Sequence, residues 1–171
     1  MRVADTSALY ALFFEEDAHH SKAHAFLADG EAVLIPAEIL AETVWLLDRK
    51  FGHLAAREAG ATLRRLPNVE VQPSWDDPWD NVLGQAWLEY QAGRGKLSYA
   101  DAVVVAWCRK RRLKPWTYDK HIESLAGAEK GPAPLGRSHE SSLTNRRSRP
   151  FDAISNFAAS LHKRRDRRPF Q

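Results

Sequence analysis

Cysteine is nearly absent from this chain of 171 residues, and long apolar runs are absent as well. The single Cys108 cannot form an internal disulfide, which fits a reducing cytoplasm and argues against a disulfide-rich secreted domain. Its neighbours Trp107 and Arg109 offer no base, so a buried, inert thiol is expected rather than a nucleophile. No stretch approaches the roughly 20 apolar residues that a membrane helix needs. Asp5 also interrupts the N-terminus too early for a signal peptide. These features predict a cytoplasmic protein without a membrane anchor.

Charge is unevenly distributed along the chain. Residues 137–171 hold nine Lys or Arg against three acidic residues, a net charge of +6, so the overall +3 leaves −3 for residues 1–136. The basic part begins with a Gly-, Pro-, Ser- and Arg-rich stretch typical of linkers. We therefore expect a domain at 1–129 and a basic, flexible extension at 130–171 with a possible short helix at 151–162. The extension could hold RNA through its phosphates or have no function.

Hydrophobic periodicity predicts alternating strands and helices in the domain. Along the chain the expected order is strand, two helices, strand, two helices, strand, two helices, strand. The strands are expected at 2–4, 32–35, 69–71 and in a short piece ending at 117, and the helices between them include 18–27, 37–51, 54–66 and 81–91. Parallel strands joined by helical crossovers form an α/β/α sandwich, with a central parallel sheet flanked by helices.

The helix expected at 37–51 has an apolar stripe for the core. Trp45 lies beside that stripe, and we expect it to be a core residue rather than a platform for a nucleic-acid base. Gly52 should end the helix.

Four acidic residues occupy positions at which functional sites form in such a sheet. Asp5 follows the first strand and Asp119 the last, so both lie beyond the carboxyl ends of strands. Asp101 and Glu42 belong to helices expected to pack against the sheet. Each alone has a structural explanation, since Asp5 can cap a helix and most helical glutamates are solvated. Together they could converge on one pocket, where crowded carboxylates require a cation.

The segments around these acids resemble a known family. The chain resembles the PIN-domain nucleases, in particular the VapC-type toxins of bacterial toxin–antitoxin pairs. The resemblance covers about residues 1–126 and rests on four segments in the family's order: ADTSAL, PAEILAETVWLLDRKFG, LSYADAVVVAWC and TYDKHI. It implies a PIN-like fold. The family's last strand would stand where this chain has the Gly- and Pro-rich residues 130–134.

The resemblance also implies a site and an activity. The implied catalytic acids are Asp5, Glu42, Asp101 and Asp119; Asp5, Asp101 and Asp119 would bind Mg²⁺ or Mn²⁺, and Ser7 and Thr117 would support the acids with their hydroxyls. Mg²⁺ prefers oxygen ligands, and a metal that acidifies a water can drive hydrolysis of a phosphodiester. The implied protein is a metal-dependent endoribonuclease toxin, with RNA as substrate, a cognate antitoxin as partner, and a homodimer as assembly.

An acidic pocket needs cations at its rim to bind RNA. The candidates are Arg94, Lys96, Arg112 and Lys114. A solvated helix end explains the basic run 109–112 equally well, because cations are favoured there.

Two other functions remain open. One is a housekeeping RNA- or DNA-processing nuclease of the same fold, which would not arrest growth when expressed. The other is a non-catalytic RNA-binding module, which would bind RNA without cutting it. The four acids argue against the second, because a pure binder gains nothing from crowded carboxylates.

Overall fold

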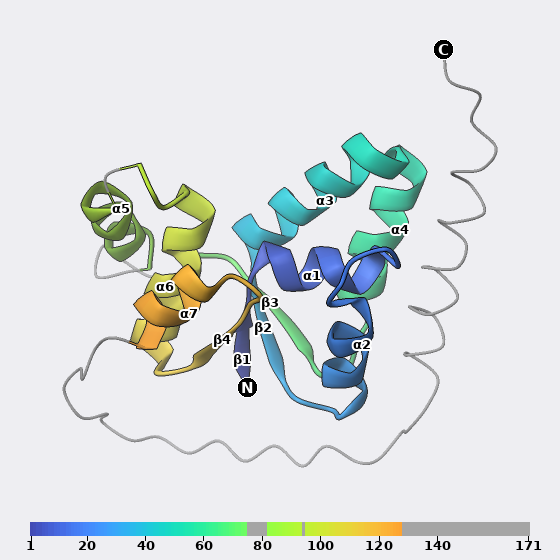
Figure 1. The fold of residues 1–171 in the computed structure, drawn as a ribbon, viewed down its shortest axis with the longest axis horizontal. Coiled ribbons are helices and arrows are strands. Elements are labelled where there is room, and N and C mark those ends of the chain that lie inside the picture. The colour runs from blue at the N-terminus through green and yellow to red at the C-terminus, as the bar shows by residue number, and fades with distance from the viewer. Residues whose placement is uncertain (75–81, 94, 128–171) are drawn as a thin grey trace.

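The computed structural model describes residues 1–74, 82–93 and 95–127 (Figure 1). Arg94 and the extension with its expected helix at 151–162 lie outside the described residues. In the described part, the strands and helices follow the predicted order through the fourth strand, and one further helix, Lys120–Gly127, comes after it.

The centre of the fold is a four-stranded parallel sheet in the order β3-β2-β1-β4. Its strands are β1 (Arg2–Ala4), β2 (Val33–Pro36), β3 (Val69–Gln72) and β4 (Lys114–Trp116). The order reverses beside β1, because β2 and β3 follow on one side and β4 returns to the other. In open parallel sheets, this reversal point at the carboxyl ends of the strands is where sites form.

Helices cover both faces of the sheet (Figure 1). One face carries α1 (Thr6–Phe13), α2 (His20–Ala28), α3 (Ala37–Phe51) and α4 (His53–Leu63); the other carries α5 (Val82–Ala92), α6 (Tyr99–Arg111) and α7 (Lys120–Gly127). The crossovers through α1–α4 and through α5–α6 run in opposite directions along the sheet, so right-handed connections place them on opposite faces. The predicted α/β/α sandwich is confirmed.

The helix α6 is buried around most of its circumference. All seven residues of Ala102–Cys108 are buried, because α6 packs against the sheet, α5 and α7. The expected burial of Cys108 is confirmed. Burial, with the negative charge of Asp5 as a smaller cause, raises the pKa of the Cys108 thiol to about 12, so it remains protonated and unreactive.

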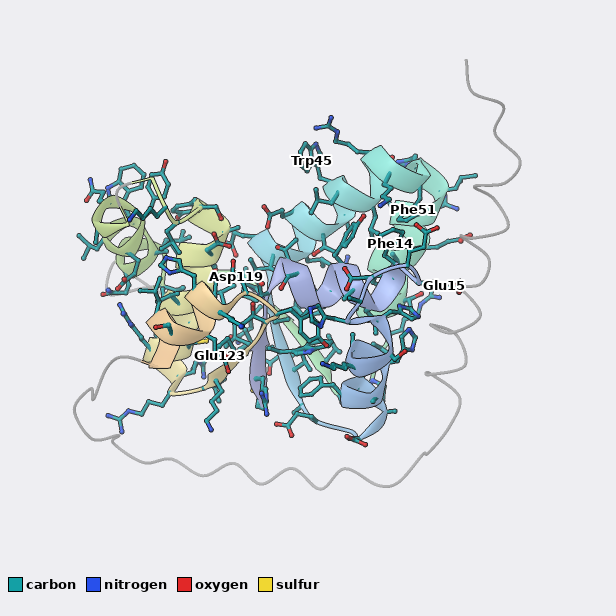
Figure 2. The ribbon with its side chains drawn as sticks, viewed as in Figure 1. Phe14, Glu15, Trp45, Phe51, Asp119 and Glu123 are labelled. Carbon is teal, nitrogen blue, oxygen red and sulfur yellow. The ribbon has the colours of Figure 1, made fainter. Side chains whose placement is uncertain are left out.

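The helix α3 has the expected apolar stripe, but its Trp45 does not lie in the core as expected. Ile39 and Leu47 are buried in the core. Trp45 is 53% exposed, so its expected role as a core residue was wrong. Its indole faces outward, where the Arg49 guanidinium lies 5.0 Å from the ring centre, and Figure 2 shows it on the outer side of α3. Periodicity placed Trp45 at the edge of the stripe, and packing left that edge uncovered.

Two histidines of α2 bind the end of α1. The Nδ1 atom of His20 lies 2.7 Å from the carbonyl oxygen of Ala11, and Nε2 of His24 lies 3.0 Å from that of Leu12. These carbonyls belong to the last turn of α1, where helical partners run out. Burial and the neighbouring His20 lower the pKa of His24, although Glu15 and the carbonyl of Leu12 oppose this.

We expect His24 to make the stability of the fold pH-dependent. Because its pKa is lower in the folded chain than the usual 6.5, its contribution is complete above pH 6.5 and is lost as the pH falls through the folded value. In His24→Gln, the amide Nε2 can still donate to Leu12 without taking up a proton. Between pH 7.5 and 5.5, the free energy of unfolding measured with urea should therefore fall more for the wild type than for His24→Gln. Equal losses would rule out this role.

Candidate active site

Asp5 is the most enclosed of the four predicted acids. It follows β1, caps the N-terminus of α1 and is only 3% exposed. Its Oδ1 accepts from the backbone N–H of Thr6 at 2.7 Å. Its Oδ2 accepts from the hydroxyls of Ser7 at 2.6 Å and Thr117 at 2.8 Å. Both hydroxyls that were expected to support the acids therefore contact Asp5.

The environment of Asp5 disfavours its negative charge. Burial raises the pKa of the carboxyl, the hydroxyls of Ser7 and Thr117 lower it, and the charge of Asp101 raises it again, with a net value above the usual one. A bound cation would reverse this balance by favouring the carboxylate. The effect of Asp101 on the pKa of Asp5 connects the two acids electrostatically.

The hydroxyls also join the ends of two strands. β1 and β4 pair in register, with Ala4 beside Trp116, so Asp5 and Thr117 are brought together from 112 positions apart. The Oγ of Ser7 accepts from the backbone N–H of Tyr118 at 3.1 Å. These bonds hold the chain after β4 against the start of α1.

Glu42 reaches the same end of the sheet as Asp5, from α3. It is half-buried, and its Oε2 accepts a hydrogen bond from the Thr6 hydroxyl. Thr6 therefore lies between Asp5, whose carboxylate accepts from its N–H, and Glu42, whose carboxylate accepts from its side chain. Sequence reasoning did not single out Thr6, although its position beside Asp5 was a usable signal.

The two remaining acids bind backbone at helix starts. Asp101 and Ser98 form a capping box: Oδ2 of Asp101 accepts from the N–H of Ser98 at 2.9 Å, and Oγ of Ser98 accepts from the N–H of Asp101 at 3.1 Å. Asp119 lies on the segment leading into α7 (Figure 2), and its Oδ1 accepts from the N–H of His121 at 2.7 Å. The N–H of Asp119 in turn donates to the Thr117 hydroxyl, so Asp119 is two hydrogen bonds from Asp5.

Within residues 1–74, 82–93 and 95–127, no three acidic, His or Cys side chains form a ready-made ligand set for a metal. Instead, the acids are linked to Asp5 through Thr6, Thr117 or charge. Carboxylate and hydroxyl oxygens are the donors that Mg²⁺ and Mn²⁺ prefer, so the residues fit such an ion.

A second glutamate of α3 is part of a separate network. Glu38 Oε2 accepts from the Ser74 hydroxyl at 2.7 Å, and Ser74 Oγ accepts from the Trp107 indole N–H at 3.0 Å. Ser74 is buried, and it joins the segment after β3 to both α3 and α6. This network fixes the start of α3, from which Glu42 projects one turn later.

The predicted RNA-binding cations are not gathered at one place. Lys96 lies in the loop before α6, close in sequence to Ser98 and Asp101. Arg112 is the left-handed C-cap of α6, and Lys114 is the first residue of β4, the strand whose carboxyl end leads to Asp119. Both are exposed, and Lys114 pairs with Arg2 at the amino ends of the strands, whereas Asp5 follows the carboxyl end of β1.

The fold and the site define an α/β protein with carboxylates at the reversal point of a parallel sheet. The chain belongs to the PIN-domain family, whose profile matches residues 2–128. It is similar to the crystal structure of Mycobacterium tuberculosis VapC20, described as a sarcin–ricin loop cleaving toxin, with 30% sequence identity and a TM-score of 0.62. That similarity covers 74% of this chain and 95% of VapC20. No curated protein matches the chain. The protein is thus a PIN-domain nuclease resembling VapC toxins, and nucleases of this family are typically metal-dependent hydrolases.

Proposed function

We propose that this protein is a Mg²⁺- or Mn²⁺-dependent endoribonuclease that acts as the toxin of a toxin–antitoxin pair. The observation that carries the proposal is the buried Asp5 at the reversal point of the sheet, held by the hydroxyls of the nearby Ser7 and the distant Thr117 while the charge of Asp101 raises its pKa. A fold gains no stability from a buried charge without a cationic partner, so this arrangement favours a functional explanation.

In this proposal Asp5, Asp101 and Asp119 hold the metal ion. When bound, the ion supplies a more acidic water and neutralises charge on the phosphodiester. Ser7 and Thr117 orient Asp5 through hydrogen bonds to Oδ2, and the Thr6 N–H does so through Oδ1. The hydrogen bond from Thr6 orients Glu42, whose second oxygen can accept a proton from the attacking water.

RNA is the substrate that the similarity to VapC20 supports, because that protein is described as cleaving the sarcin–ricin loop. Bases in single strands and loops are accessible to protein side chains, so we propose looped or single-stranded RNA as substrate. The described part of the chain has no helix long and apolar enough to cross a membrane. We place the activity in the cytoplasm, where RNA is found.

The toxin assignment brings two protein partners, a cognate antitoxin and a second copy of the chain. Exposed apolar side chains on α5 support a protein contact: Trp87 is 52% and Leu88 59% exposed, and Tyr90 lies 5.7 Å from Trp87 between ring centres. Single exposed apolar residues are ordinary, but a contiguous aromatic group marks an interaction surface.

Cleavage of a mixed RNA pool by the purified full chain tests the proposal. With Mg²⁺ or Mn²⁺ the wild type should cut, whereas EDTA should stop it and Asp101→Asn should be inactive. Cutting that persists in EDTA would contradict metal dependence. Expression in bacteria separates the toxin from a housekeeping nuclease: the wild type should arrest growth and Asp101→Asn should not. Cleavage in vitro without growth arrest would favour the housekeeping enzyme.

A further inference from the structure

A cavity of about 550 Å³ adjoins the acidic site. Thr6 and Ser7 line it, and they are the residues whose hydroxyls donate to Glu42 and Asp5. Only the side chains of Thr6 and Ser7 would therefore separate a ligand in this cavity from Glu42 and Asp5. Its volume is in the range of small-molecule pockets and is sufficient for a single nucleotide.

Flat aromatic rings form part of the cavity wall. Tyr10 comes from α1 and Tyr118 from the segment between β4 and α7. The ring of Tyr118 is stacked on that of His19, with centroids 4.2 Å apart and planes 7° apart, which fixes its orientation. The N–H of Tyr118 also donates to Ser7. A ring held in this way is suited to stack on a base, since every base has a π-face.

Two cations stand at the cavity near the end of α3. Arg49 and Lys50 are exposed, and no described carboxylate forms an ion pair with either. Instead they rest on aromatic faces, with Nζ of Lys50 3.5 Å from the centre of the Phe14 ring and the Arg49 guanidinium 5.0 Å from that of Trp45. Figure 2 shows Phe14 and Phe51 together beside this end of α3. The charges are thus positioned without being neutralised.

One acid also lines the cavity. Asp17 accepts from the backbone N–H of His19 at 2.8 Å through one carboxylate oxygen. The other oxygen is able to accept a hydrogen bond from an exocyclic amino group of a base. The cavity therefore combines stacking surfaces, positive charge and one acceptor.

We propose that this cavity binds one nucleotide of single-stranded RNA next to the bond that is cut. Its base stacks on Tyr118, and Arg49 and Lys50 contact the adjoining phosphates. Such a subsite explains why unpaired cations stand beside an acidic centre that would otherwise repel RNA. The inference rests on the proposed nuclease function but is tested by binding alone.

The first test is fluorescence anisotropy of a labelled ten-nucleotide RNA with the full chain in EDTA, where no cleavage occurs. The double variant Arg49→Gln/Lys50→Gln is compared with Arg64→Gln/Arg65→Gln, which removes the same charge from exposed positions at the end of α4 outside the cavity. Loss of two phosphate contacts should lower the slope of log K against log salt by about 1.4, at about 0.7 per contact for single strands. The α4 variant should keep the wild-type slope. Equal slopes in the two variants would overturn the proposal.

The second test removes the stacking ring. Tyr118→Leu should raise Kd for the same RNA about tenfold, whereas Tyr118→Phe, which keeps the aromatic ring, should leave it unchanged. Thermal unfolding checks that both variants are folded. Unchanged RNA binding by Tyr118→Leu, or a loss confined to binding of a protein partner, would assign the cavity to something other than RNA. Pocket-dependent RNA binding by a wild type that never cuts would keep this inference and reject the nuclease function.

Discussion

Asp5→Asn should abolish RNA cleavage while leaving the fold as stable as the wild type, or more so. The amide loses the negative charge proposed to hold the metal, so we expect a drop on the order of 10⁴ in cleavage rate, the scale of losing an essential catalytic group. Asn is as good a helix N-cap as Asp, and it removes a charge from a side chain that is only 3% exposed. Single-turnover cleavage and urea unfolding measure the two effects separately.

Asp5→Ala is the matched control for this prediction. It should be equally inactive but less stable by about 2–4 kcal/mol, because it removes the cap and leaves the hydroxyls of Ser7 and Thr117 without their acceptor. Mn²⁺ binding measured by calorimetry should be weakened in both variants. If Asp5→Asn cut RNA at the wild-type rate, Asp5 would be a structural cap and the proposed site would be wrong.

Phe13→Ala should cause the largest loss of stability among single truncations near the site. Phe13 is 1% exposed at the last turn of α1, the helix that begins with Thr6 and Ser7. Truncating such a buried phenylalanine to alanine lowers the free energy of unfolding by about 3–5 kcal/mol, because apolar burial is lost and a cavity is left behind. Because the free energy of unfolding of a domain is only about 5–15 kcal/mol, the midpoint of urea unfolding should fall strongly.

The next residue supplies the comparison. Phe14 is only partly buried, and its ring contacts Tyr10, Phe51 and the Lys50 ammonium at the surface. Phe14→Ala should therefore lose roughly half as much stability or less. Equal losses in the two variants would mean that α1 is not anchored through Phe13.

Several features of the fold could be predicted from local sequence because local physics determines them. Glycine at position 52 ends α3 at a φ of +87°, which other residues rarely adopt, and the apolar stripe of α3 packs against the core as expected. Helix ends were less exact where a turn continued the apolar pattern. The helix expected at 54–66 ends at Leu63, because Leu66 is buried from a turn rather than from the helix.

The site was predicted only in part, for a similar reason. Positions after strands and at helix starts indicated Asp5, Asp101 and Asp119, and the resemblance to PIN-domain nucleases added the supporting hydroxyls. Periodicity could not show that Trp45 faces outward, since the pattern gives a face of α3 but not what covers its edge. Nor could it show the hydrogen bond from Thr6 to Glu42, which spans 36 positions.

By itself, the sequence determined the order of the elements through β4, the burial of Cys108 and the acids that follow β1 and β4, because each can be read from residues close together in the chain. Only the tertiary structure decided which strand stands beside β1. β4 pairs with β1 on the side away from β2, and this pairing brings Thr117 to Asp5 and Tyr118 to Ser7. The cavity walled by Tyr118, Tyr10 and Lys50 follows from the same pairing. Contacts across more than a hundred positions arise from the packing of the whole sheet, and no local pattern encodes them.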